Sequence, residues 1–192
     1  MPRTMSTALI CLLLLASFGF AQDKPTTTAN PLSDYNKKAY ANIKNNILRS
    51  AEKMPEESYS FKPTEAVRSY GQILGHVADA QYLFCSSVLG EKSPGPKVEK
   101  TKTSKAELTA ALKDAFTYCD KAYDGLTDAT AAETIKFFGS DAPKLGVLGF
   151  NNMHNMEHYG NLVTYMRMKN IVPPSSEPRP QAQKPPQSGE KK

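Results

Sequence analysis

Residues 69–90 read SYGQILGHVADAQYLFCSSVLG, and this stretch has the features of one complete amphipathic helix. Ser69 and Gln72 have the spacing of a capping box, in which each side chain bonds to the backbone of the other residue. Apolar residues then recur every three or four positions until Gly90, a residue type that commonly follows the end of a helix. The stretch therefore predicts an α-helix, and it carries one histidine, His76, in an otherwise apolar segment.

Three further segments repeat this pattern along the chain. Asn30-Pro31 resembles a helix cap followed by a proline at the first helical position, and Ser104 with Glu107 forms a second capping box. Four amphipathic helices of similar length predict an all-α fold, a four-helix bundle. The three additional helices are expected over residues 31–54, 105–125 and about 143–169.

The last helix is expected to follow a loop that contains Phe137-Phe138-Gly139. Ser140 or Asp141 can cap this helix, and Pro173-Pro174 closes it. The linker between the second and third helices, residues 91–103, is rich in lysine and is typical of a solvated loop. At about 3.3 Å per residue it can cross the whole length of a helix, so these two helices could run parallel.

The chain has three histidines, and all of them fall in predicted helices. His154 and His158 are four residues apart, so their side chains lie one turn apart on the same helix face and can bind one ion together. His76 can supply a third nitrogen from another helix, which leaves a fourth coordination position open for water. The pattern predicts a divalent metal site, for which zinc or nickel is the expected ion.

The alternative is that these are ordinary core or surface histidines with hydrogen bonds to their neighbours. Asn151, Asn161 and Tyr165 continue the helix face that carries His154 and His158. Polar groups are an unusual choice for a bundle core, and they suggest side chains that support a site or line a wet pocket.

Two carboxylates lie close to the histidines along the chain, Asp79 three residues after His76 and Glu157 directly before His158. We name both as candidate catalytic residues, acting as general acid or base or orienting a ligand imidazole. A surface salt bridge is the alternative for Glu157. Residues 154–158 also match the H-x-x-E-H pattern of inverzincin proteases, but only 34 residues follow His158, and most of them form a proline-rich tail.

Two stretches are similar to motifs of the DinB/YfiT-type four-helix proteins, a family of metalloenzyme candidates. Residues 69–78 (SYGQILGHVA) resemble the motif of the family's second helix, and residues 154–162 (HNMEHYGNL), with the closing residues 171–174 (IVPP), resemble that of its fourth. The resemblance covers about residues 30–174. It implies an up-down-down-up bundle and a divalent metal held by His76, His154 and His158.

The resemblance also implies a range of activities: thiol S-transferase, thiol-dependent isomerase or metal-dependent hydrolase. The leading hypothesis is a metalloenzyme whose three-histidine site activates water or a substrate thiol as nucleophile. The alternative is a non-catalytic bundle that uses the ion only to stabilise its fold. The expected partner is a small-molecule substrate that the sequence does not name, and a homodimer is compatible with the sequence.

The two ends of the chain differ in composition from the predicted bundle. Residues 1–21 combine a basic Arg3, an apolar run and a small-x-small site that ends at Ala21, which predicts a cleaved secretory signal and a periplasmic or secreted protein. The apolar run is too short for a membrane span. Residues 22–29 are interpreted as a linker, residues 30–172 as the bundle and residues 173–192 as a Pro-rich disordered tail.

Most of the net charge of +5 lies in these ends. Residues 22–172 contain 24 − 5 = 19 basic and 19 − 2 = 17 acidic residues, a net charge of +2. A folded part whose net charge is so close to zero does not support nucleic-acid binding.

Cys85 and Cys119 remain after signal cleavage, and neither has the spacing of a thiolate metal site. Cys85 lies nine residues after His76, which is half a rotation from the histidine face at roughly 3.6 residues per turn. Because disulfide geometry is specific, we expect two free thiols.

Overall fold

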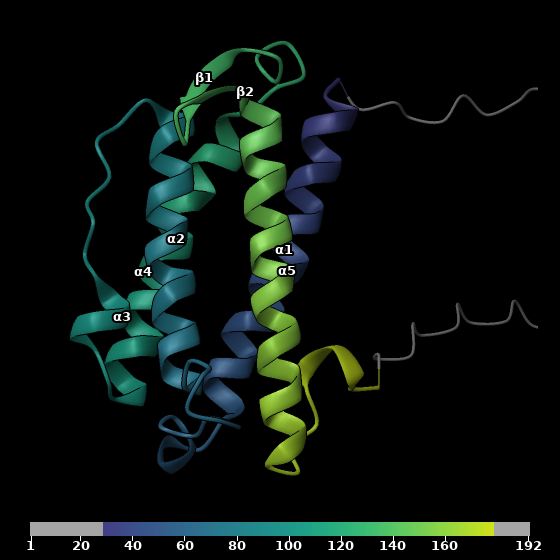
Figure 1. Cartoon of the computed structure of the whole chain (residues 1–192). Coiled ribbons are helices and arrows are strands. Elements are labelled where there is room, and N and C mark those ends of the chain that lie inside the picture. Colours follow the sequence, from purple (N-terminus) through teal and green to yellow (C-terminus); the bar gives the residue numbers. More distant parts are fainter. Residues whose placement is uncertain (1–28, 179–192) are drawn as a thin grey trace, which may run out of the picture.

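Four long helices make up most of the structure, a computed structural model that describes residues 29–178 (Figure 1). Their bounds are α1 Pro31–Lys53, α2 Tyr70–Leu89, α4 Lys105–Gly125 and α5 Lys144–Met168. The shorter elements are η1 Glu56–Ser58, α3 Val98–Thr101, β1 Thr134–Phe137, β2 Ser140–Pro143 and η2 Pro174–Ser176. The predicted all-α four-helix bundle is confirmed.

A complete capping box begins α2, as predicted, whereas α4 begins with only the Ser104 half of its predicted box. The Ser69 hydroxyl accepts from the Gln72 backbone N–H at 3.2 Å, and Gln72 Oε1 accepts from the Ser69 N–H at 2.8 Å. The Ser104 hydroxyl accepts from the Glu107 N–H at 3.3 Å. Such caps pair backbone donors that the first helical turn leaves free, and each stabilises its helix by about 1 kcal/mol.

The start of α1 differs from the prediction, because Asn30 makes no side-chain cap. Instead, Asp128 from the loop after α4 accepts the backbone N–H groups of Leu32 and Ser33 at 3.1 and 2.8 Å. Asn30 Oδ1 accepts in turn from the Asp128 N–H at 2.9 Å. The capping carboxylate is 96 positions from Leu32 along the chain, so local spacing could not indicate it.

The segment before α5 is a β-hairpin, not the predicted loop with a helix cap. Phe138 and Gly139 form the two-residue turn between β1 and β2, with φ values of 47° and 81°. These left-handed values suit a tight hairpin turn. Ser140 and Asp141 therefore lie in β2, and α5 begins after Pro143 without a side-chain cap.

The helices α2 and α4 run parallel. Gly71 lies against Leu108 near the start of both helices, and Cys85 is bonded to Cys119 toward their ends. The linker between them returns along the outside of α2 and forms α3 just before α4, so the predicted loop is partly helical (Figure 1). Because α1 and α5 run the opposite way, the order is up-down-down-up, as expected.

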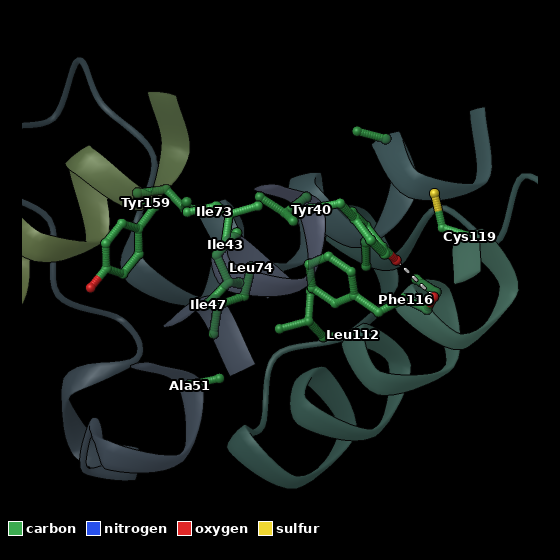
Figure 2. Close-up of a cluster of buried hydrophobic side chains, with 14 of the residues drawn as sticks. Tyr40, Ile43, Ile47, Ala51, Ile73, Leu74, Leu112, Phe116, Cys119 and Tyr159 are labelled. Carbon is green, nitrogen blue, oxygen red and sulfur yellow. Dashed lines mark hydrogen bonds between the residues drawn. The ribbon is translucent and has the colours of Figure 1, made fainter. Parts of the chain in front are cut away.

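One core of aliphatic and aromatic side chains holds these helices together (Figure 2). It includes Ile47 of α1, Leu74 of α2 and Leu112 of α4, all fully buried. Tyr40 of α1 is also buried, and its hydroxyl donates to the Phe116 carbonyl of α4 at 3.0 Å. This pairing satisfies a polar group that would otherwise be costly inside the bundle.

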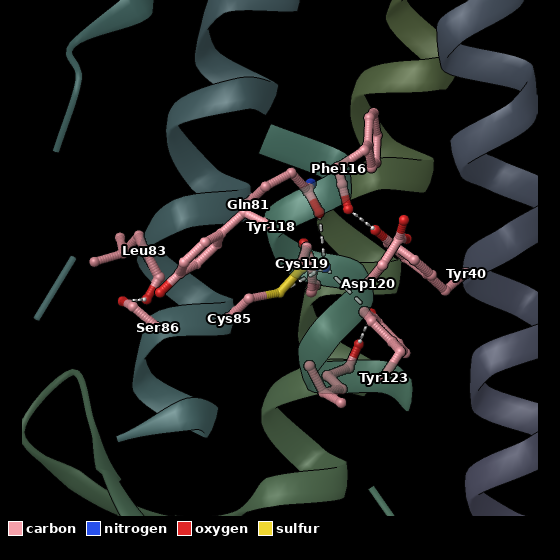
Figure 3. The surroundings of a disulfide bond; sticks show 12 residues. Tyr40, Gln81, Leu83, Cys85, Ser86, Phe116, Tyr118, Cys119, Asp120 and Tyr123 are labelled. Atoms are coloured by element: carbon pink, nitrogen blue, oxygen red, sulfur yellow. Dashed lines mark hydrogen bonds between the residues drawn. A yellow bond between two sulfur atoms is a disulfide. The ribbon is translucent and has the colours of Figure 1, made fainter. Parts of the chain in front are cut away.

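A disulfide joins Cys85 of α2 to Cys119 of α4, with their Cα atoms 5.2 Å apart (Figure 3). The prediction of two free thiols is therefore wrong. Cys85 lies about half a rotation from His76 around α2, and the side of α2 that it occupies is the side that packs against α4. The parallel course of the two helices then brings the two sulfurs to the same height.

The folded part extends beyond Val172, where the bundle was predicted to end. Pro174 is buried, and Glu177 forms ion pairs with Arg49 and Lys53 of α1. The first residues of the predicted tail are therefore part of the bundle.

The predicted signal segment, residues 22–28 of the linker and residues 179–192 of the tail lie outside the described residues. Among the helices of residues 29–178, none combines the length and the apolar character needed to cross a membrane.

Candidate metal centre

The three histidines converge from two helices, His76 from α2 and the other two from α5. His154 Nε2 lies 3.1 Å from His76 Nε2 and 3.1 Å from His158 Nε2. One nitrogen of each ring lies within 4.8 Å of one nitrogen of both others. The four-residue spacing accounts for the pair on α5, and the packing of α2 against α5 adds His76 to it.

The geometry of these nitrogens fits a divalent metal ion. Two nitrogens bound to one tetrahedral zinc at roughly 2.0–2.1 Å lie about 3.3 Å apart, close to the 3.1 Å separations in this site. Hydrogen bonds alone satisfy the cluster poorly, because His154 Nε2 offers either one N–H or one in-plane lone pair to two neighbours. A cation among three lone pairs removes this conflict.

Their surroundings favour the neutral form of all three imidazoles. Burial lowers the pKa of His154 to about 3, and the charges of His158, His76 and Arg68 add to this effect. Burial, followed by the charge of His76, lowers the pKa of His158 to about 4. The pKa of His76 is also lowered, chiefly by burial and then by Arg68. Only a neutral imidazole can donate a lone pair to a metal, so near neutral pH the site is ready to bind one.

Glu99 of α3 contacts the His76 ring at its second nitrogen. Its Oε2 lies 3.3 Å from His76 Nδ1, and its Oε1 accepts a hydrogen bond from Arg68 Nε at 2.9 Å. By contrast, the Nδ1 atoms of His154 and His158 are buried with no hydrogen-bond partner among the described residues. Sequence reasoning missed Glu99, because it lies in a linker that was interpreted as a solvated loop.

Asp79, a candidate catalytic residue from the sequence, lies in a different environment from the one expected. Its two carboxylate oxygens accept the backbone N–H groups of Val98 and Glu99 at 2.7 and 3.1 Å. They cap the start of α3, where backbone donors are free and a negative charge is favourable. With both oxygens engaged there, Asp79 holds α3 in place and is not positioned as a general acid or base.

Glu157 lines a polar pocket of about 640 Å³ next to the histidines. The pocket is also lined by His158, Glu99, Arg68 and Asn161. Within residues 29–178 Glu157 makes no ion pair, so the salt bridge considered as its alternative role is not found there. Glu157 therefore lies at the pocket beside His158 without a cationic partner among the described residues.

An aromatic cluster lies beside His154 and consists of Phe84, Phe137, Phe138 and Phe150. The Phe84 ring meets the His154 ring edge to face at 5.3 Å, and it lies 5.4 to 6.2 Å from the other three rings. Phe138, at the hairpin turn, is 68% exposed. The hairpin therefore places accessible apolar surface close to the histidines.

Known proteins share this arrangement of helices. YjoA of Bacillus subtilis, described as an uncharacterized protein, is 27% identical over 135 residues, which cover 67% of this chain and 83% of YjoA. Its crystal structure, described as that of a DinB-like protein, matches with a TM-score of 0.59 at 22% identity, covering 72% of this chain and 93% of that one.

Two further crystal structures resemble the chain over a similar extent. A DinB-like protein of Bacillus cereus matches with a TM-score of 0.65 at 19% identity, covering 73% of this chain and 95% of that one. A conserved protein of Enterococcus faecalis matches with a TM-score of 0.60 at 11% identity, covering 71% and 95%. At these identities the likeness concerns the fold.

The sequence model of the DinB superfamily matches residues 40–162, a span that contains all three histidines and Glu99. This agrees with the resemblance of residues 69–78 and 154–162 to the family's motifs. The match covers more than half of the chain, which therefore belongs to the DinB superfamily.

Proposed function

We propose that this protein is a divalent-metal enzyme that hydrolyses a small-molecule substrate, with His76, His154 and His158 as metal ligands. The observation that carries this proposal is the convergence of three neutral imidazoles beside a polar pocket of about 640 Å³. A bound divalent ion supplies a Lewis acid, which lowers the pKa of water or a thiol and polarises a substrate oxygen. Imidazole ligands suit zinc and nickel, and we propose one of these ions.

The chain itself contributes proton transfer and substrate binding. Glu157 can accept the proton of the nucleophile, because its carboxylate lines the pocket next to His158. Arg68 lines the same pocket and offers a cation to an anionic group of the substrate. A thiol in place of water would make the same site a thiol transferase. We favour water, since low-molecular-weight thiol cofactors belong to the cytoplasm and we propose that the protein is exported.

The competing function is a metal-stabilised scaffold without catalysis. A structural site is expected to complete its coordination with a fourth side chain, and Asp79 was the nearest candidate on α2. Both oxygens of Asp79 bind the backbone of α3 instead. A polar pocket lined by His158 also adjoins the cluster and offers space for a substrate, and both observations favour the enzyme.

We also propose that the mature protein acts outside the cytoplasm. The composition of residues 1–21 is that of a secretory signal. The disulfide between Cys85 and Cys119 is consistent with an oxidising compartment, because such bonds are rare in cytosolic proteins.

Metal analysis tests the ligand assignment. Protein purified from the exported fraction without added metal is expected to contain about one divalent ion per chain, as a three-histidine site binds a single metal. Replacing His154 and His158 together by Ala should remove most of it, because His76 alone binds an ion weakly. Full metal content in this double variant would exclude the assignment.

Glu157→Gln separates catalysis from scaffolding. The variant keeps the shape of the side chain and removes the proton acceptor, so we expect unchanged metal content and a rate lower by about 10²-fold or more. The assay is hydrolysis of a panel of ester, amide and phosphoester substrates, with His76→Ala as the inactive control. If the metal-loaded protein shows no turnover above this control on the whole panel, the scaffold function replaces the enzyme.

A further inference from the structure

Glu99 lies where a carboxylate that supports a metal-binding histidine would lie. The inference drawn from this position rests on the metal site proposed above. We infer that Glu99 is a positioning residue: it accepts a hydrogen bond from His76 Nδ1–H and so directs the lone pair of His76 Nε2 toward the ion. The contact behind this inference is the 3.3 Å separation between Glu99 Oε2 and His76 Nδ1.

The chemistry of imidazole explains why such a contact matters. A neutral imidazole carries its proton on one nitrogen and its in-plane lone pair on the other. A carboxylate at Nδ1 selects the tautomer with the proton there, which leaves Nε2 free to bind metal. Carboxylates in this position also raise the basicity of the ligand and fix the orientation of its ring.

Two hydrogen bonds and the close approach of α3 to α2 hold Glu99 in place, so its position is determined by the fold. Arg68 binds Oε1 of Glu99 and leaves Oε2 for His76. Asp79 binds the backbone N–H of Glu99. Gly75 lets α3 approach α2 closely, because a Cβ at this position would lie 2.6 Å from the Glu99 Cα.

His76 needs this support more than the other two ligands do. His154 and His158 lie on one helix, so the helix geometry fixes their spacing. His76 comes from α2, and its ring must be oriented independently of α5. Among the described residues no carboxylate contacts a ring nitrogen of His154 or His158, which makes Glu99 specific to the ligand from the second helix.

Metal affinity is the first measurement, made by competition of zinc with a chromophoric chelator. Glu99→Gln keeps the size of the side chain but removes its charge, and Glu99→Ala removes the acceptor altogether. We expect affinity to fall by about 10-fold in the first variant and by up to about 100-fold in the second. Glu65→Gln is the matched control, since it removes another carboxylate of the same pocket, one that pairs with Lys62 and contacts no imidazole nitrogen, and its affinity should equal that of the wild type. Equal affinity in wild type and both Glu99 variants overturns the inference.

The imidazole tautomer is the second measurement, made by ¹⁵N NMR on the metal-free wild type. We expect His76 to carry its proton on Nδ1 and to lose this preference in Glu99→Gln, with little change in melting temperature. A role in folding alone would lower the melting temperature and leave the tautomer unchanged, which contradicts the inference. If the wild type binds no metal, the proposed metal site is refuted. The tautomer of His76 still tests the role of Glu99, because a proton on Nε2 would refute that role.

Discussion

The pKa values of His154 and His158, about 3 and about 4, link the stability of the metal-free protein to pH. In the unfolded chain these imidazoles titrate near their reference value of about 6.5. At pH values between the folded-state and the unfolded-state pKa values, the unfolded chain binds more protons than the folded protein. The free energy of unfolding therefore falls as pH falls. The stabilisation is present above about pH 6.5 and is lost progressively as pH falls toward the folded-state pKa values.

We therefore predict that the melting temperature of the metal-free protein decreases between about pH 7 and about pH 4, and decreases less in a His154→Gln, His158→Gln variant. Carboxylates with lowered pKa, such as Asp128, act in the same direction in both proteins, so the difference between the two curves isolates the histidines. Calorimetry in chelator-treated buffers measures it. Parallel curves for wild type and variant would show that the histidines are not held neutral by the fold.

At the scale of helices, a buried amide network sets the register of α5 on α2. Gln81 Nε2 donates to Asn155 Oδ1 at 2.7 Å, and Asn151 Nδ2 donates to Gln81 Oε1 at 3.0 Å. All three side chains are fully buried, so a shift of either helix would leave costly unpaired groups. Asn155 directly follows His154, and the network thereby helps to fix the rotation that brings His154 to His76.

The disulfide between α2 and α4 should stabilise the bundle mainly by restricting the unfolded chain. The two cysteines are 34 residues apart, and closing a loop of that length is worth about 4 kcal/mol in the chain-entropy model. We predict that a Cys85→Ala, Cys119→Ala variant unfolds at lower urea concentration, with a loss of up to about 4 kcal/mol.

Metal affinity serves as the control for this variant, because Cys85 lies on the side of α2 away from His76, and affinity should change little. Thiol titration of unfolded, unreduced wild type should find no free thiol among Cys85 and Cys119. Two titratable thiols in that experiment, together with an unchanged urea midpoint in the variant, would contradict the bond.

At the scale of the whole molecule, residues 173–178 follow α5 and pack against the bundle. Pro174 is buried, and Ser175 pairs with Tyr159 of α5 through their hydroxyls at 2.8 Å. Apolar burial and one such hydrogen bond together stabilise a fold by about 1–2 kcal/mol. These residues therefore belong to the cooperative unit.

We predict that a chain ending at Val172 melts about 3–8 °C below the full-length mature protein, as expected for a loss of that size in a domain of this length. A chain ending at Pro178 keeps the contacts of Pro174 and Ser175 and should melt with the full-length protein. Circular dichroism melts of the three proteins make the comparison. Identical melting of all three would show that the segment adds nothing to stability.

Several features of the fold followed from the sequence, because they depend on residues close together in the chain. Ser69 with Gln72 and Ser104 with Glu107 mark helix starts through local hydrogen bonds, and apolar periodicity marks the length of each helix. The four-residue spacing of His154 and His158 likewise places both rings on one face. The hairpin before α5 was not predicted. Two-residue hairpin turns usually contain Asn-Gly, Asp-Gly or Gly-Gly, whereas here Phe138 has a positive φ before Gly139.

Taken by itself, the sequence determined the four helices, their order and the three histidines as candidate ligands, because helix periodicity and capping are local properties. Only the tertiary structure decided which groups surround those histidines. Glu99 reaches His76 because Asp79 caps α3 and because Gly75, which has no side chain, lets α3 lie close to α2. Cys85 is bonded to Cys119 because α2 and α4 pack side by side. These contacts join segments that are distant along the chain, and their partners are chosen by the packing of helices, which no local spacing encodes.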